Sequence, residues 1–237
     1  MARLEWDGLQ DRTFESGIDR GVLYALMDRG RAWNGLIAVN ERITGAEPRP
    51  IHQDGVKVSN RVIPGEFEAT LEAYTYPEQF FEFNNGFGAI GTGLFADEQT
   101  PRPFGLSYRT MIGNPVDGKN AHYRIHLIYN AVATPSDRMY QTHDDNPETM
   151  TFSWDITTTP VHMPKLRPAS HLIIDSKKTR PDILKRLEDR LYGTSSSNPS
   201  WPSPQTLVEY FYGYNFSENG YGHGPYGLTT YGHGQES

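Results

Sequence analysis

The chain contains no cysteine. Disulfide bonds and thiolate metal sites are therefore excluded, and the composition fits folding in a reducing compartment. No stretch approaches the roughly 20 consecutive apolar residues that span a bilayer. The first residues, MARLEWDGLQD, lack the apolar core of a secretory signal peptide. We therefore expect neither secretion nor membrane insertion.

Positive charge is also scarce. The 22 Lys and Arg residues face 29 Asp and Glu residues, which gives a formal net charge of −7. Binding of a phosphate backbone depends on cationic side chains, so nucleic-acid binding is not expected as the main function. The length of 237 residues predicts one sizeable domain. The 14 tyrosines favour half-buried β surfaces and interfaces.

What the chain has in quantity is alternation of apolar and polar residues, the period-two pattern of a strand with one buried face. Three long runs between Phe104 and Val161 show it. In the second run, Tyr123, Ile125, Leu127, Tyr129 and Ala131 are expected to face one way, and His122, Arg124, His126 and Asn130 the other. Further strands are predicted at 21–28, 32–43, 51–60 and 169–175, with a turn at Asp54-Gly55.

The cleanest alternation lies in Gly65–Thr75, where an acidic row opposes Phe67, Ala69, Leu71 and Ala73. The row consists of Glu66, Glu68 and Glu72. Three carboxylates are too costly to bury without partners, so this face should meet water. A solvated sheet face is the simplest interpretation, and a carboxylate pair for hydrolysis is a second one.

One helix is well signalled, at Arg180–Leu191. Thr179 is the expected N-cap, Pro181 lies in the first turn and Gly193 follows the end. Its apolar residues form one stripe, which should pack on the sheet: Ile183, Leu184, Leu187 and Leu191. A shorter helix is expected after Ser203-Pro204, burying Leu207, Val208 and Phe211.

Several motifs favour ordinary structure over chemistry. Gly86–Gly91 matches GxGxxG without the strand and helix that dinucleotide binding needs. His122 and His126 have metal-ligand spacing on a helix, but on a strand they lie about 13 Å apart. His143, Asp144 and Asp145 fall in a polar loop between two strands. We therefore predict no catalytic residue, cofactor or metal site.

The last 25 residues differ in composition, with seven Gly, four Tyr and two copies of YGHG. Such a segment cannot bury enough apolar surface to fold alone. His223 and His233 would make only a weak zinc site, so an interaction tail is the preferred interpretation. Residues 1–212 are expected to form a β domain, and residues 213–237 a Gly/Tyr/His-rich extension.

Six segments, in order from about Leu4 to Phe211, resemble the major tail protein of long non-contractile-tailed bacteriophages, the tail tube subunit. They are GVLYALMDRGRAWNGLIAVNE, EFEATLEAYTYPEQF, FGLSYRTMIGN, YRIHLIYNAVATPSDRMY, ITTTPV and HLIIDSKKTRPDILKRLEDRLYG. Close relatives often carry Cys where this chain has Phe83, a packing position. The tail after Phe211 lies outside the resemblance.

The resemblance implies a mainly β, sandwich or barrel-like fold with one flanking helix and a short second helix. It implies a non-enzymatic virion protein without cofactor, assembled in the host cytoplasm into hexameric rings that stack into the tail tube. Its partners would be itself, the tape measure, the tail terminator and the distal tail proteins. DNA would pass through the lumen without specific binding, and Glu66, Glu68, Glu72 and Asp155 become candidate lumen-facing residues. The loop 44–64 is suited to reach across a contact between rings.

Two other functions remain open from the residues. One is a β-sandwich hydrolase using the region of His143 and Asp144. The other is an adhesive β module, suggested by the Tyr/Gly tail.

Overall fold

The computed structural model of the chain describes residues 8–9, 12–25, 29–45, 48–62, 65–84, 88–91, 93–96, 99–135, 150–164 and 166–212. The strands are β1 (Phe14–Ala25), β2 (Arg31–Ala32), β3 (Leu36–Thr44), β4 (Pro48–Gln53), β5 (Val56–Val62), β6 (Glu66–Ala73), β7 (Gly88–Gly91), β8 (Leu94–Ala96), β9 (Phe104–Asn114), β10 (Gly118–Pro135), β11 (Phe152–Thr158) and β12 (His171–Asp175). The helices are the 3-10 helix η1 (Glu78–Glu82), α1 (Pro181–Tyr192) and α2 (Pro204–Tyr212). The predicted mainly β fold with two helices is confirmed.

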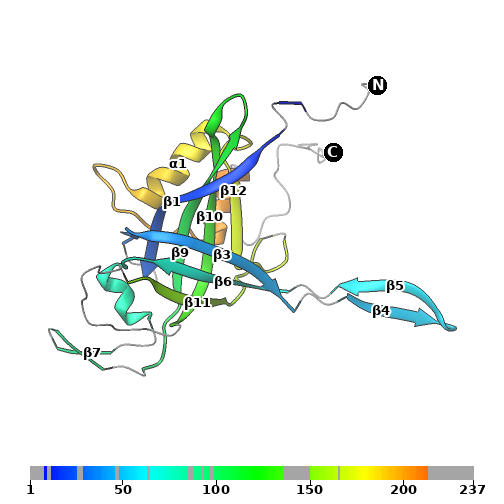
Figure 1. The fold of residues 1–237 in the computed structure, drawn as a ribbon, viewed down its shortest axis with the longest axis horizontal. Helices are drawn as coiled ribbons and strands as arrows, with labels where there is room; N and C mark the ends of the chain where they lie inside the picture. The colour runs from blue at the N-terminus through cyan, green and yellow to red at the C-terminus, as the bar shows by residue number, and fades with distance from the viewer. Residues whose placement is uncertain are drawn as a thin grey trace, which may run out of the picture.

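One antiparallel sheet provides both layers of the fold. Its order is β2-β1-β9-β10-β11-β6-β3, and β12 also pairs with β10. The first half of β10 pairs with β12 and the second half with β11. Figure 1 shows β3, β6 and β11 running across β9 and β10, so the sheet folds over itself. The result resembles a sandwich in which β10 belongs to both layers.

The place where the sheet folds over itself coincides with a bulge in β10. The register between β10 and β9 shifts between Ile128 and Ala131, and Asn130 has a φ of 48°. Asparagine tolerates this left-handed conformation better than most residues, and a bulge bends a strand. The bulge also reverses the alternation, so Ala131 does not share a face with Ile125 and Leu127, contrary to the prediction. Ala131 packs into the other core.

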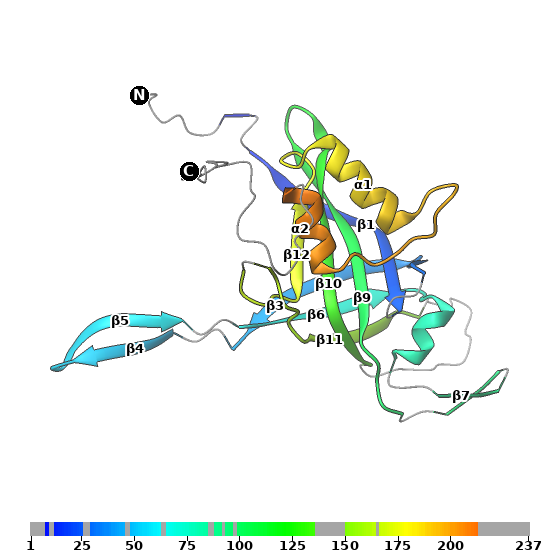
Figure 2. The same ribbon diagram turned by 180° about the vertical axis from the view of Figure 1, so that it is seen from behind.

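Two hydrophobic cores result. The first lies between the two halves of the sheet and includes Trp33, Leu71, Phe80 and Trp154. The second lies between the sheet and the helices and includes Tyr24, Ile125, Leu127, Leu187 and Leu191. Figure 2 shows α1 and α2 in front of β9, β10 and β12, on the face that β3 and β6 do not cover.

Helix α1 carries the predicted apolar stripe. Leu187 and Leu191 are fully buried, and Ile183 and Leu184 are half-buried. The prediction of Thr179 as the N-cap is wrong, because Arg180 occupies the N-cap position and makes no side-chain capping hydrogen bond there. Thr179 instead donates a 2.8 Å hydrogen bond from its hydroxyl to the backbone oxygen of Asp175.

Three further expectations need correction. The segment 32–43 does not form one strand, because a turn around Gly35 separates β2 from β3. Part of the predicted glycine-rich loop forms the β7–β8 hairpin. Phe211 is exposed rather than buried; it lies in the last turn of α2, one turn beyond the buried Leu207.

Two hairpins pair only with themselves within the described residues, β4 with β5 and β7 with β8. Asp54 and Gly55 have φ values of 51° and 78°, as the predicted turn requires. Figure 1 shows β4 and β5 extending well away from the sandwich. No helix among the described residues is long and apolar enough to cross a membrane.

Candidate functional site

The predicted acidic row lies on the outer layer of the fold. Strand β6 sits between β3 and β11. Ala69, Leu71 and Ala73 are buried on its core side. On the other side, Glu66 is exposed, and Glu68 and Glu72 are half-buried.

Neighbouring strands extend this face. Asp155 on β11 is opposite Thr70 and accepts a 2.9 Å hydrogen bond from its hydroxyl. Arg42 on β3 is opposite Glu68, and its Nε lies 2.7 Å from the Glu68 carboxylate. The hydrogen bonds from Arg42 and Thr44 hold the pKa of Glu68 below its usual value. The face is therefore acidic, with Arg42 offsetting one carboxylate.

His143 and Asp144, the residues of the hydrolase hypothesis, lie outside the described residues, as do Asp145 and both YGHG units.

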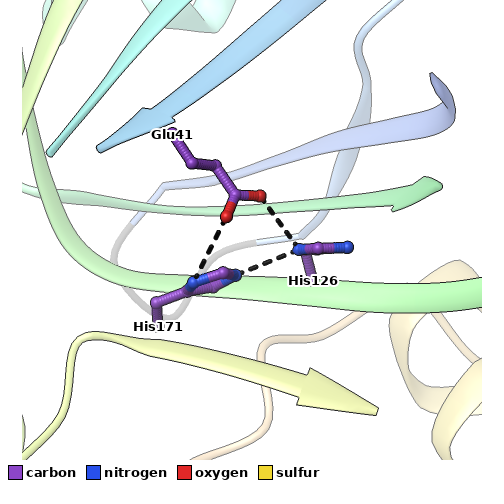
Figure 3. A group of neighbouring side chains, drawn as sticks. All are labelled: Glu41, His126 and His171. Carbon is purple, nitrogen blue, oxygen red and sulfur yellow. Dashed lines mark hydrogen bonds and ion pairs between the residues drawn. The ribbon is translucent and has the colours of Figure 1, made fainter. Parts of the chain in front are cut away.

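A second polar cluster lies between the two layers and was not predicted. It joins Glu41 of β3, His126 of β10 and His171 of β12 (Figure 3). One ligand atom from each residue lies within 4.8 Å of the other two. His126 Nδ1 is 3.1 Å from Glu41 Oε1 and 3.1 Å from His171 Nε2. Among the described residues, this is the one group of three or more such ligands close enough to share a metal ion.

The three side chains differ in exposure. The side chain of His126 is 5% exposed, that of His171 12% and that of Glu41 33%. The cluster is therefore closed on the side of β10 and open to solvent along Glu41.

Polar and aromatic neighbours hold each member in place. The hydroxyl of Tyr108 on β9 donates to Glu41 Oε1. His126 Nε2 is 3.0 Å from Thr110 Oγ1, and the Thr110 hydroxyl donates to Glu15. The ring of Phe67 packs on His171, with centroids 4.3 Å apart.

These contacts shift the protonation equilibria. Burial alone would raise the pKa of Glu41, but hydrogen bonds from His126 and Tyr108, together with both histidines, lower it to about 2. Burial lowers the pKa of His171 to about 4, although Glu41 opposes the shift. Burial and the neighbouring carboxylate raise the pKa of Tyr108 above its ordinary range. At neutral pH the cluster thus contains an ionised carboxylate and a neutral His171.

The sequence offered a different histidine pair, His122 and His126, which have metal-ligand spacing on a helix. We predicted no metal site there, because on a strand the two residues lie about 13 Å apart. In the structure His122 lines a separate open pocket of about 440 Å³ with Asn114, Asp117 and Lys177. One feature of the sequence could have indicated the cluster. Glu41 is two residues from each of the apolar Val39 and Ile43, so on a strand it lies on their face, which is expected to point inward.

The chain was compared with protein families, curated proteins and solved structures. No protein-family model matches the chain, and no curated protein shows a significant match. Among solved structures, the chain is similar to one in the cryo-EM structure of the anti-feeding prophage (AFP) baseplate, 6-fold symmetrised. The alignment has 9% sequence identity and a TM-score of 0.34, and it covers 72% of this chain and 97% of the other.

Proposed function

We propose that this chain is a phage tail tube subunit that assembles into hexameric rings, which stack into a conduit for the genome. The ordered sequence resemblance from about Leu4 to Phe211 supports this function. The structural observation that carries it is the β4–β5 hairpin, which pairs with no other strand among the described residues.

An isolated two-stranded hairpin is marginally stable in water. Here it also exposes apolar side chains, with Val56 65% and Val58 56% exposed. Exposed apolar groups on a projecting arm favour contact with another protein surface. In a stacked tube, the arm would lie against the next ring.

Open strand edges support lateral assembly. Strand β3 ends the sheet, and β12 pairs on one side with β10. Ile43 and Ile173 on these two strands are 70% and 54% exposed. Unpaired edges with apolar residues promote aggregation in a monomer, and a closed ring of identical subunits removes them.

The acidic face of β3, β6 and β11 fits the wall of a DNA channel. Closely spaced negative charge repels phosphate and prevents tight binding. We assign Glu66, Glu68, Glu72 and Asp155 to the lumen on this ground. The function needs no catalysis, and residues 213–237 would serve as an extension that contacts a neighbouring subunit or another tail protein.

The proposal places the chain in the virion tail after assembly in the host cytoplasm. Besides other copies of itself, its partners would be the tape measure, tail terminator and distal tail proteins. DNA would pass without specific binding.

Electron microscopy of the purified full chain tests the assignment. Rings or tubes with a central channel are expected, with intersubunit contacts in the permanent class of about 2,000 Å² or more. Val58→Asp should block stacking while rings persist. Ser59→Asp is the matched control, because it places the same charge at the next position, on the opposite face of β5. A monomer at every concentration, without rings or tubes, would refute the proposal.

A further inference from the structure

We propose that Glu41, His126 and His171 bind one divalent transition-metal ion, with Zn²⁺ the best match. The site would tie β3 in one layer to β10 and β12 in the other. This inference is independent of the tail tube assignment.

The donor geometry fits one ion. Zinc takes histidine nitrogen and carboxylate oxygen at about 2.0–2.2 Å, which puts two ligands of a tetrahedral ion about 3.3 Å apart. The distances from His126 Nδ1 to Glu41 Oε1 and to His171 Nε2 are both 3.1 Å. Two imidazoles on such an ion have ring centres about 5 Å apart, and the rings of His126 and His171 are 5.2 Å apart. Small shifts would admit the ion.

Hydrogen bonding turns the correct nitrogen of His126 toward the site. The single proton of the Thr110 hydroxyl goes to Glu15, so Thr110 Oγ1 accepts from His126 Nε2–H at 3.0 Å. His126 Nδ1 faces the Glu41 carboxylate at 3.1 Å. Without an ion, Nδ1–H donates to that carboxylate. A histidine nitrogen loses its proton when it ligates a metal, so the ion would take the place of this proton between Nδ1 and Glu41.

The surroundings resemble the outer shell of a metal site. Ligating histidines usually donate their second N–H to a polar group, and ligating carboxylates are themselves hydrogen-bonded. His126 meets this pattern through Thr110, and Glu41 meets it through the Tyr108 hydroxyl. The Glu41 side chain is 33% exposed, which leaves an entry path for the ion, and a water would supply the fourth ligand.

The donor set also selects the class of ion. Two nitrogens and one carboxylate suit Zn²⁺, Co²⁺ or Ni²⁺. Ca²⁺ and Mg²⁺ prefer sites made of oxygen ligands. The ion would hold β3 of one layer to β10 and β12 of the other.

The test is titration of chelator-treated full-length protein with ZnCl₂ at pH 7.5 by calorimetry, together with thermal melting. We expect one ion per chain with micromolar or tighter affinity and a rise in melting temperature. Co²⁺ should give the intense visible absorption of a four-coordinate site. Glu41→Gln and His171→Ala should abolish binding, and Tyr108→Phe, which removes only the orienting hydroxyl, should weaken it about 10–100-fold.

Two controls separate this site from other histidines. The double variant His223→Ala/His233→Ala removes the YGHG histidines, and His162→Ala removes an exposed one; all should retain the ion. The inference is overturned if wild-type protein binds no zinc, or if binding survives Glu41→Gln and His171→Ala but is lost with the YGHG histidines. Circular dichroism of each variant establishes that the fold is intact.

Discussion

The hydroxyl of Tyr24 on β1 donates a 2.7 Å hydrogen bond to the backbone oxygen of Leu191, near the end of α1. Both residues are buried in the core between sheet and helices. The carbonyls of the last helical turn have no partner inside the helix, so this bond satisfies a group that burial would otherwise leave unpaired. It also fixes where α1 sits on the sheet.

Tyr24→Phe should therefore lower the free energy of unfolding by about 1–3 kcal/mol, the cost of leaving a buried carbonyl unsatisfied. Urea denaturation followed by circular dichroism measures the change. Tyr74→Phe is the control, because Tyr74 is about half exposed, and its effect should stay within about 0.5 kcal/mol. Equal effects of the two substitutions would contradict the importance of this bond.

Leu187→Ala should cost about 2–5 kcal/mol, as a large-to-small change at a fully buried position. Ile183→Ala on the same helix should cost clearly less, because Ile183 is half-buried and water already reaches it. Both values come from urea denaturation. An unchanged stability in Leu187→Ala would mean that the stripe does not hold α1 on the sheet.

The protein should lose stability in alkali as several tyrosines resist ionisation. Burial raises the pKa of Tyr123 to about 12 and raises the pKa values of Tyr24 and Tyr129 further. A pKa raised by folding gives stability that is complete below the unfolded value of about 10 and declines as pH rises above it. The free energy of unfolding should therefore fall steadily above pH 10.

Absorbance of tyrosinate near 295 nm checks this expectation. The buried tyrosines should ionise only together with the loss of tertiary structure, and Tyr24→Phe/Tyr129→Phe should show a shallower alkaline decline. Full ionisation near pH 10 in a folded protein would argue against the burial of these hydroxyls.

If the acidic face lines the channel, its charge should affect passage of DNA. We predict that Glu66→Lys/Glu72→Lys leaves assembly intact, because the core face of β6 is untouched, and slows genome ejection. The slowing should be greater at low salt, where screening is weak. Glu68 is retained in this design because it pairs with Arg42.

The matched control is Glu66→Gln/Glu72→Gln, which removes charge without reversing it and should have a smaller effect. Ejection kinetics from assembled particles give the readout. Normal ejection in the lysine variant, or a tube structure with these residues on its outer surface, would reject the lumen assignment and leave the tube function standing.

The sequence by itself determined the local features, those that depend on residues close together along the chain. Alternation in β6 separates Leu71 from Glu72 because successive side chains of a strand point to opposite faces. The apolar spacing of α1 and the Asp54-Gly55 turn are likewise local properties. The sequence therefore predicted the existence and buried faces of most elements. Among its failures is the second half of β10, where a bulge at Asn130 reversed the alternation.

Only the tertiary structure decided which strands meet. Glu41, His126 and His171 are separated by 85 and 45 positions in the sequence, and none carries a local signal of its partners. They converge because β10 bends at its bulge. The first half of β10 pairs with β12, and the second half pairs with β11, which is followed in the sheet by β6 and β3. Strand alternation tells which way a side chain points, but it does not tell what lies opposite, and that depends on the path of the whole sheet.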